Sequence, residues 1–396
     1  MKTIVILGGG YAGINLVDSL KKELKDQLGT AVRVILVDKN SYHFRKVLLV
    51  KAITEDADDL QLKIPFHRYI SKGIEVLQGE VTRINKTGNI VEIEKEDHQA
   101  VEVHYDYLVI TLGSRVKDNE NFIGGMTLKD ESSAHDIKDR LIDLINKTKK
   151  LNSDHKRQSN LKIALVGAGI TGIETACELA VWLKEQALVH GIDPNGVEVL
   201  LFDPKTRLLH EAPDHISSRL EKKMNKFGVK FFSNTRVKEF NNGYLVCTDG
   251  RKYEIGLCII TNGVEVNPTI KQLQLPLSDQ NQLIVNDCYE VEGHKNIYSI
   301  GDCARIIDPI TNKYDGMTCK EAIPQAQRLA KIIKHKMTKQ PNHIVHTSYP
   351  VKLFCVSLGP KEGFVWIQKW GMNFTLTGQL GLRFRNYTWN LASLLK

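Results

Sequence analysis

Two short stretches constrain the fold of this chain more than any others. "TIVILGGGYAGI" (residues 3–14) and "IALVGAGITGIETA" (residues 163–176) each join an apolar strand to a G-x-G-x-x-G turn and an apparent helix. In this setting glycine lets the backbone approach a pyrophosphate, and the helix N-terminus offers it amides and a positive dipole end. One such turn is a weak signal, but two predict two dinucleotide sites, or one site and a degenerate copy.

Each unit continues into a second strand that ends in an acidic residue. "VRVILVDKN" ends in Asp38 and "VEVLLFDPK" ends in Asp203. Asp38 follows its turn at close to the roughly 20-residue spacing at which an acid meets a ribose hydroxyl. In the second unit the loop "HGIDPNG" absorbs the longer spacing. The pattern is therefore strand, glycine turn, helix, strand and acid, found twice.

Composition narrows the class of protein. The chain has 396 residues, of which 42% are hydrophobic and 25% charged, enough for two or three domains. It contains no run of about 18 apolar residues, and its first apolar segment leads into a glycine turn, so we expect neither a spanning helix nor a secretory signal. Seven scattered cysteines without a C-x-x-C pair predict no metal site and suit a reducing cytoplasm.

The formal charge of +8 is spread along the chain and matches no nucleic-acid motif, so we expect no nucleic-acid partner. An anionic membrane surface would also attract it. A polar stretch at residues 146–160 is interpreted as the connection into the second domain. After about Pro341 the chain carries three of its four tryptophans, which indicates a separate third region.

Three more strands end in a polar residue and glycine or in Gly-Asp, in "YDYLVITLGS" (residues 105–114), "LCIITNGVEVNP" (residues 257–268) and "NIYSIGDCA" (residues 296–304). Their order and spacing over residues 1–335 resemble the two-dinucleotide flavoprotein superfamily that includes the disulfide reductases. This resemblance implies an α/β fold with two Rossmann-like domains, FAD on the first and NADH on the second. It divides the chain into an FAD domain (1–117 and 266–340) interrupted by an NAD domain (118–265), with a C-terminal membrane-docking or dimerisation region (341–396).

The resemblance also assigns cofactor-binding roles. Asp38 would meet the adenosine ribose of FAD, Asp302 the ribityl–pyrophosphate end, and Asp203 would favour NADH by repelling the 2′-phosphate of NADPH, although Lys205 and Arg207 follow closely. The remaining FAD candidates are Gly8, Gly10, Tyr11, Ala12, Gly13, Lys39, Val81, Thr111, Gly113 and Cys319, and the remaining NADH candidates are Gly167, Gly169, Gly172 and Gly263.

Cysteine placement separates the branches of this superfamily. "DKNSYHFRKVLLVKA" contains no cysteine, and Cys177 stands alone in its helix, where a small buried hydrophobe is the simpler interpretation. Without a dithiol, electrons would pass directly from flavin to an external acceptor. The chain then resembles the type II NADH:quinone oxidoreductases, in its segment "NSYHFRKVLL" and in Glu174. The family role of Glu174 would be proton handling at the acceptor side; the alternative is a helix N-terminal acid stabilised by the dipole.

One motif departs from that family. Its Ala-Gln-x-Ala-x-Gln helix, which lines the quinone pocket, aligns here with "TCKEAIPQAQ", where Lys320 and Pro324 replace the two glutamines. Lys320 would favour a developing anionic oxygen on the acceptor or pair with Glu321; the alternative is a solvated surface lysine. The acceptor is therefore a quinone or another small electron acceptor.

The tail and the function leave alternatives open. If "RFRNYTWNLASLL" is helical, Phe384, Tyr387 and Leu391 share an apolar stripe with Leu394 and Leu395, while Arg385, Trp389 and Lys396 lie toward another side. Such a stripe would lie in a bilayer interface or pack on the body or a second subunit. The leading hypothesis is a cytoplasmic enzyme, peripheral on the cytoplasmic face of the membrane, that passes electrons from NADH through FAD to a quinone. Its rivals are a soluble diaphorase with another small acceptor or redox protein, and an NADH-responsive flavoprotein that acts through a partner.

Overall fold

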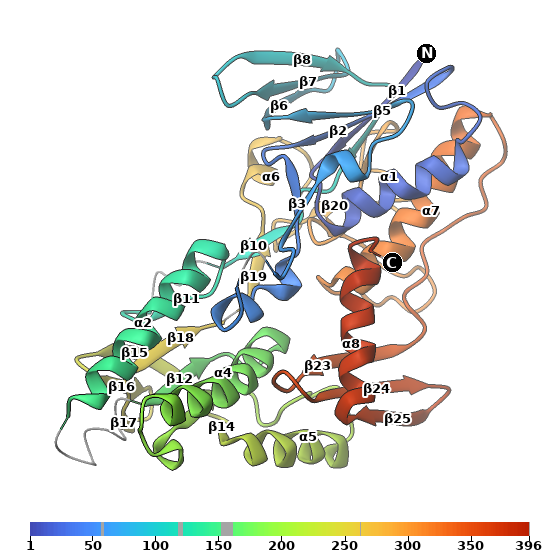
Figure 1. Ribbon diagram of the computed structural model, residues 1–396. Helices are drawn as coiled ribbons and strands as arrows, with labels where there is room; N and C mark the ends of the chain where they lie inside the picture. The colour runs from blue at the N-terminus through green and yellow to red at the C-terminus, as the bar shows by residue number, and fades with distance from the viewer. Residues whose placement is uncertain (57–58, 118–121, 152–160, 262, 396) are drawn as a thin grey trace.

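A computed structural model describes residues 1–56, 59–117, 122–151, 161–261 and 263–395 of the chain. Two five-stranded parallel sheets lie one above the other in Figure 1, and a smaller C-terminal region lies beside both.

The first sheet has the strand order β21-β9-β1-β2-β5 and is parallel throughout. Helices α1 and α7 pack side by side on one face, and the antiparallel sheet β6-β7-β8 covers the other. Because both faces are covered, its central strands read as continuous apolar runs. The elements are β1 (Lys2–Leu7), α1 (Tyr11–Glu23), β2 (Val32–Asp38), β5 (Ile74–Gln78), β6 (Glu80–Asn85), β7 (Ile90–Glu94), β8 (Ala100–His104), β9 (Tyr107–Ile110), β21 (Ile297–Ser299) and α7 (Cys319–Met337).

The second sheet has the order β11-β18-β12-β13-β14 and is also parallel. Helices α2, α4 and α5 pack on one face, and the antiparallel sheet β15-β16-β17 packs on the other. The elements are β11 (Met126–Thr127), α2 (Glu131–Lys149), β12 (Lys162–Val166), α4 (Ile170–Val189), β13 (Glu198–Phe202), α5 (Asp214–Phe227), β14 (Val229–Phe232), β15 (Val237–Asn241), β16 (Tyr244–Cys247), β17 (Lys252–Glu254) and β18 (Leu257–Ile260).

The two sheets repeat one plan. Strands β1, β2, β5 and β9 of the first occupy the same order as β12, β13, β14 and β18 of the second, and a three-stranded antiparallel sheet follows the third strand of each. The outer strand β21 of the first sheet comes from beyond the second sheet in sequence. The predicted fold class is therefore confirmed, including the interruption of the first dinucleotide unit by the second; the exact domain boundaries remain predictions.

Two short antiparallel strands, β10 (Ser114–Val116) and β19 (Val264–Val266), carry the chain from the first unit to the second and back. Beyond the crossing lie the short helix α6 (Thr269–Gln272) and the strand pair β20 (Leu283–Ile284) and β22 (Ala304–Arg305). A further pair, β3 (Tyr42–Phe44) and β4 (Lys63–Pro65), follows β2.

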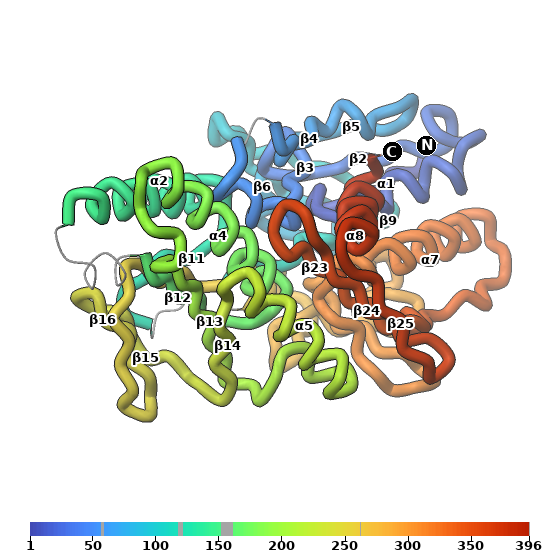
Figure 2. Tube along the Cα trace, turned by 60° about the horizontal axis from the view of Figure 1, so that its bottom comes forward, coloured from blue at the N-terminus to red at the C-terminus, as the bar shows by residue number. Residues whose placement is uncertain are grey.

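The C-terminal region consists of the antiparallel sheet β23 (Lys352–Ser357), β24 (Gly363–Lys369) and β25 (Met372–Thr377), followed by α8 (Gly378–Ala392). Trp366 and Trp389 pack into the core of the second unit. The end of α8 lies against α1 (Figure 2). There the Asn15 side-chain amide donates to the Ala392 carbonyl, and the Tyr69 hydroxyl donates to the Ser393 carbonyl. The region therefore touches both dinucleotide units.

The buried face of α8 differs from the apolar stripe that its sequence predicts. Arg385 is 7% exposed and Trp389 4%, whereas Tyr387 is 62% exposed and Leu391 46%. Gly381 lies on the same buried face, because a Cβ there would stand 2.6 Å from the Gly363 carbonyl oxygen. Tyr387 and Leu391 of the predicted stripe therefore do not pack on the body, and the alternatives of a bilayer or a second subunit stay predictions. The helix instead buries Arg385, which is possible when another element supplies its counter-charge.

Candidate functional site

The first glycine turn joins β1 to α1. Gly8 has a φ of +104°, which favours glycine, and its N–H donates to the Val37 carbonyl at 2.7 Å. A Cβ on Gly13 would stand 1.9 Å from the Gly8 carbonyl oxygen, so only glycine allows this approach of helix and turn. Gly10 caps α1 without a side-chain hydrogen bond, and a Cβ there would meet nothing within 4 Å among the described residues. The start of α1 therefore borders open space at Gly10.

The second turn, between β12 and α4, has the same geometry. Gly167 has a φ of +109°, and a Cβ on Gly172 would stand 1.8 Å from the Gly167 carbonyl oxygen. Gly169 caps α4, again without a side-chain cap, and a Cβ on it would have no described atom within 4 Å. The two turns thus form two similar cradles of backbone amides, as the sequence predicts.

The two acids bind their own turns. Asp38 accepts hydrogen bonds from the backbone N–H of Gly9 (2.7 Å) and of Asn40 (2.8 Å). Asp203 accepts the equivalent bonds from Ala168 (2.7 Å) and Lys205 (2.8 Å). Each carboxylate therefore lies beside its cradle at the end of the second strand, and burial raises the pKa of Asp38 above its ordinary value.

The strand ends that follow complete each cradle. The Thr111 hydroxyl donates to the carbonyl of Gly8 at 2.7 Å, and the Thr261 hydroxyl donates to that of Gly167 at 3.0 Å. Gly113 and Gly263 come next with φ values of +64° and +56°, and a Cβ on either would meet no described atom within 4 Å. The structure thus places Thr111, Gly113 and Gly263 at the edges of the cradles.

Asp302 lies where β21 approaches the first turn. Its carboxylate accepts a hydrogen bond from the Ser114 hydroxyl at 2.5 Å, and the Lys46 ammonium donates to the Ser114 carbonyl at 2.7 Å. Burial raises the pKa of Asp302 and lowers that of Lys46, while the opposite charges of the two groups resist both shifts. A Cβ on the preceding Gly301 would stand 2.9 Å from that of Ala12, so the first turn and Asp302 are close neighbours.

A buried glutamine of α7 is hydrogen-bonded to the residue before Asp302. Gln325, 2% exposed, accepts a hydrogen bond from the Gly301 N–H at 2.9 Å and donates to Asp315 at 2.8 Å. The N-terminus of α7 is therefore held at a set position relative to Asp302. Open space at the glycines, unshared helix N-terminal amides and a carboxylate at each strand end fit two pyrophosphate-linked dinucleotides.

Glu174, in the first turns of α4, is bound by the C-terminal region. Its carboxylate accepts two hydrogen bonds from the Arg385 guanidinium (2.9 and 3.1 Å) and one from the Ser357 N–H (2.8 Å). Both charged side chains are buried, Glu174 at 2% and Arg385 at 7% exposure. The third guanidinium nitrogen of Arg385 contacts the Cys355 sulfur at 3.5 Å. The Glu174 carboxylate is therefore an acceptor of charge-assisted hydrogen bonds from the C-terminal region.

Lys320 lies in the first turn of α7 and is half-buried. Its ammonium donates to the Leu353 carbonyl of β23 at 3.4 Å. Glu321 instead accepts a hydrogen bond from the Thr318 hydroxyl at 2.8 Å. Because Pro324 has no N–H, it cannot donate to the Lys320 carbonyl one turn earlier. Lys320 thus lies where α7 meets the C-terminal region.

A sequence profile of the family described as "Pyridine nucleotide-disulphide oxidoreductase" matches residues 2–327. The chain belongs to this family. The match ends close to the start of the C-terminal region, so the matched part contains both cradles, Asp302 and the first half of α7.

Several curated relatives of this family member are named type II NADH:quinone oxidoreductase. The one from Haemophilus influenzae is 29% identical over 333 residues, which cover 78% of this chain and 74% of the relative. The one from Staphylococcus epidermidis is 26% identical over 374 residues, covering 91% and 89%.

Solved structures show the same fold. The chain superposes on NDH2 from Plasmodium falciparum in complex with NADH with a TM-score of 0.81, at 18% identity and with 100% and 95% of the two chains covered. It superposes on the sulfide:quinone oxidoreductase of Aquifex aeolicus with a TM-score of 0.78, at 15% identity and with 99% and 90% covered.

The other predicted cofactor residues lie in different surroundings. The Tyr11 hydroxyl accepts a long hydrogen bond from the Val47 N–H (3.4 Å), and burial raises its pKa. Lys39 is exposed beside Asp38. Val81 is 4% exposed, with its side chain in the core between the sheets. Cys319 begins α7, and burial raises the pKa of its thiol.

The sequence did not identify Lys46, Ser114, Gln325, Ser357 or Arg385 as site residues. Lys46 lies inside the quoted "NSYHFRKVLL" segment. Gln325 directly follows the position of the family's second glutamine, and this neighbouring glutamine could have indicated it. Nothing in the sequence pairs Arg385 with Glu174, which lies 211 positions away. Within the described ranges, no group of three or more His, Cys, Asp or Glu side chains could hold a metal ion.

We expect Gly13→Ala and Gly172→Ala to affect different nucleotides. Each new Cβ would lie under 2 Å from a carbonyl oxygen, and opening the turn to relieve this contact costs on the order of 1–3 kcal/mol. Gly13→Ala should weaken FAD retention about tenfold or more, measured by flavin absorbance after dialysis. Gly172→Ala should retain FAD and weaken NADH binding by a similar factor. Equal effects of both variants on both ligands would contradict the assignment of the turns.

We expect Arg385→Met to lower the free energy of unfolding by about 3–5 kcal/mol, because it leaves the Glu174 carboxylate buried without its counter-charge. Urea denaturation of the purified holoprotein would measure this. Arg383→Met, on the exposed side of the same helix, is the matched control and should cost little. The double variant Glu174→Gln/Arg385→Met should lose less stability than Arg385→Met alone; an equal or larger loss would mean that the ion pair does not account for the effect.

Proposed function

We propose that this protein oxidises NADH and passes two electrons, through bound FAD, to a quinone. The observation that carries the proposal is the repeated cradle: two glycine turns of the same geometry, each with its own acid, in one chain. The named relatives support the direction of electron flow, because they cover most of this chain and are called NADH:quinone oxidoreductases.

Residues of the first cradle would hold FAD. The start of α1 at Gly10 would bind the pyrophosphate, Asp38 the ribose, and Asp302 with Ser114 the ribityl end; the last two are supported by their positions beside the first turn. The N-terminus of α7, held by Gln325, would offer a positive dipole end to the ring system. Bound FAD supplies a two-electron carrier that takes a hydride from the nicotinamide.

Residues of the second cradle would hold NADH. The start of α4 at Gly169 would bind the pyrophosphate, and Asp203 would accept from the adenosine ribose and repel a 2′-phosphate. Lys205 lies two residues further along with its backbone bound to Asp203, so a cation is also close to this end. We expect NADH to be preferred over NADPH, because the Asp203 carboxylate would act on a 2′-phosphate more strongly than the Lys205 ammonium.

The acceptor side would be formed by α7 and the C-terminal region. Reduction of a quinone by NADH consumes one proton from solution in addition to the hydride. Lys320 is the cation closest in sequence to the α7 N-terminus, and its ammonium is held by the Leu353 carbonyl alone among the described partners. We infer that it stabilises negative charge on the acceptor oxygen, while Glu174, held by Arg385, sets the position of α4 against this side and remains our candidate for proton handling.

The substitution of both family glutamines favours a second candidate, a diaphorase that reduces a different small acceptor. A cation at position 320 suits an acceptor that becomes anionic, whereas glutamine suits a neutral carbonyl. The third hypothesis, a flavoprotein that signals through a partner, predicts NADH binding with little turnover.

Steady-state NADH oxidation by the holoprotein separates these functions. We expect rapid oxidation with a soluble menaquinone or ubiquinone analogue, and slow oxidation with oxygen or a ferredoxin. Rapid oxidation with another acceptor, and not with any quinone, would establish the diaphorase; a tight NADH complex without turnover would establish the third hypothesis.

Lys320→Gln tests the acceptor side directly. Loss of one charge-assisted hydrogen bond to an anionic oxygen costs about 1.5–3 kcal/mol, so reoxidation by quinone should change about tenfold or more. Reduction by NADH should be unchanged, and stopped-flow absorbance resolves the two half-reactions. Lys331→Gln, on the exposed side of the same helix, is the matched control. If Lys320→Gln leaves both half-reactions as in the unaltered protein, Lys320 does not face the acceptor.

We also propose that the C-terminal region docks on the cytoplasmic face of a membrane. It exposes large apolar side chains at a hairpin tip, along β25 and on the outer face of α8: Trp370, Met372, Phe374, Leu376, Leu380, Tyr387 and Leu391. Lys369 lies over the Trp370 ring at 4.1 Å, and Arg383 is exposed nearby in the sequence, so cations flank the apolar set. None of the described helices has the length and apolar character needed to span a bilayer.

Vesicle flotation tests this docking. Trp370→Ser and Leu380→Ser each remove a large apolar side chain worth about 1.5–3 kcal/mol of burial, so each should weaken binding to anionic vesicles about tenfold. Ile310→Ser, which alters an equally exposed residue elsewhere, is the control. If vesicle binding is absent and the same substitutions instead dissociate a dimer in sedimentation experiments, the apolar set covers a second subunit.

A further inference from the structure

A chain of hydrogen bonds connects the segment after α7 to the glycine that precedes Asp302. The Asp315 side chain is 7% exposed and accepts from the Gln325 carboxamide at 2.8 Å and from the Ser348 hydroxyl at 3.0 Å. The carbonyl oxygen of the Gln325 side chain accepts from the Gly301 N–H at 2.9 Å. Asp315 and Gln325 therefore link the segment after α7 to the edge of the first cradle.

A buried histidine holds the Asp315 carboxylate. The His346 ring is 1% exposed, with Nε2 3.3 Å from that carboxylate and Nδ1 3.0 Å from the hydroxyl of the fully buried Tyr289. When the phenol donates to Nδ1, the proton of the neutral ring is on Nε2 and faces the carboxylate. Burial alone would raise the pKa of Asp315, but the bonds from His346 and Gln325 lower it below its ordinary value. Asp315 is therefore an ionised acceptor.

An ionised carboxylate accepts hydrogen bonds and donates none, and this determines the orientation of the Gln325 carboxamide. Its NH₂ group must face Asp315, so its carbonyl oxygen faces the Gly301 N–H. Gly301 has a φ of +78°, and a Cβ there would stand 2.9 Å from that of Ala12 in the first turn. Asp315 thus acts, through one side chain, on the backbone that places Asp302 beside the first cradle.

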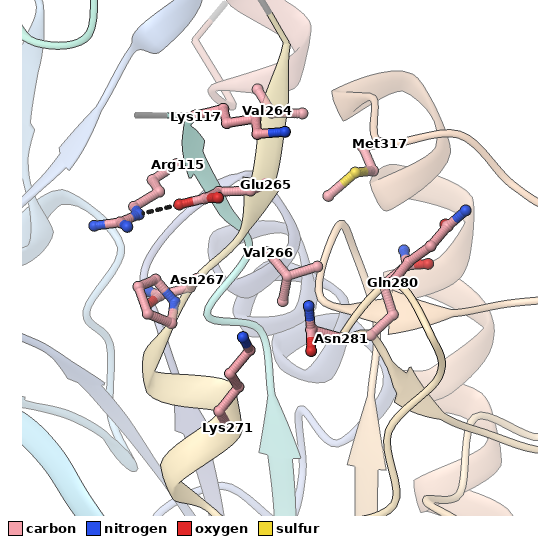
Figure 3. Close-up of a pocket in the computed structure, with 12 residues that line it drawn as sticks. Arg115, Lys117, Val264, Glu265, Val266, Asn267, Lys271, Gln280, Asn281 and Met317 are labelled. Carbon is pink, nitrogen blue, oxygen red and sulfur yellow. Dashed lines mark hydrogen bonds and ion pairs between the residues drawn. The ribbon is translucent and has the colours of Figure 1, made fainter. Parts of the chain in front are cut away.

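The segment that leads from Asp315 into α7 borders a cavity of about 440 Å³. Met317 extends into this cavity, and the crossing strands β10 and β19 lie across from it, where Arg115 donates to Glu265 at 2.7 Å (Figure 3). A segment beside open space has fewer packing contacts to hold it. The position of the start of α7 therefore depends more strongly on the hydrogen bonds of Asp315 and Gln325.

We propose that Asp315 is a positioning residue for bound FAD and acts through Gln325. By orienting this carboxamide it sets the place of Gly301, and with it the Asp302 carboxylate and the α7 N-terminus that would meet the ribityl chain and the ring system. The proposal rests on the assignment of FAD to the first cradle. Its consequence is that two acceptors at positions 315 and 325 disrupt the FAD site, whereas exchange of the donor and the acceptor leaves it intact.

Substitutions that exchange these groups, with almost no change in side-chain volume, test the proposal on the FAD-loaded protein. Gln325→Glu places a second carboxylate against Asp315, and because the two repel, we expect FAD to be released about tenfold faster or more at about pH 8. The midpoint potential of the flavin that remains bound should fall, since the positive end of α7 is displaced.

Adding Asp315→Asn to Gln325→Glu restores the pair, with the NH₂ group now at position 315 and the carboxylate at position 325. The double variant should release FAD within about threefold of the rate of the unaltered protein and regain most of the potential. Gln327→Glu, the same substitution on the exposed side of α7, is the matched control and should change neither quantity.

Thermal midpoints of all variants separate this role from one in stability alone, which would leave the potential of bound flavin as in the control. If Gln325→Glu does not fold, recovery of folded yellow protein in the double variant is the same rescue. The proposal is overturned if Gln325→Glu behaves like Gln327→Glu, or if Asp315→Asn recovers nothing that Gln325→Glu loses. An unaltered protein that binds no FAD would instead overturn the assignment of the first cradle, and this inference with it.

Discussion

The buried ion pair between Arg385 and Glu174 is the interaction on which the arrangement of the three parts depends. Glu174 belongs to the second dinucleotide unit, Arg385 to the C-terminal helix, and the end of that helix is bonded to Asn15 and Tyr69 of the first unit. A buried charge is tolerated only with its partner in place, so α4 and α8 have one stable relative position. Through α8 this position also determines where the C-terminal region lies against α7.

The two dinucleotide units are equal in their turns and unequal in their surroundings. Both turns close on a glycine that approaches a carbonyl oxygen, and both acids bind the turn amide in the same way. Among the residues that the structure describes, the first also has a strand-end acid next to it, Asp302, and a helix N-terminus held by Gln325, and the second has no counterpart of either. This inequality suits a chain in which one nucleotide stays bound between reactions and the other is exchanged as substrate.

The sequence predicts the local motifs correctly, but it does not predict which side chains far apart in the chain are partners. The glycine turns, the strand ends at Thr111 and Gly113, and the neighbourhood of Asp302 lie where the patterns predict them, although their contacts with cofactors stay predictions. The burial of Arg385 on α8 could not be predicted, because a periodicity argument places arginine outside unless its counter-charge is known. The structure places the Val81 side chain in the core, and its contact with a cofactor stays a prediction.

By itself the sequence determined those features whose cause lies within a few residues: where glycine is required for a positive φ or a close approach, where a strand ends in an acid, and the absence of a cysteine pair beside them. Only the tertiary structure decided which distant charges meet. Glu174 meets Arg385, and Lys320 meets the Leu353 carbonyl, because sheets and helices pack to bury apolar surface, and that packing is a property of the whole chain.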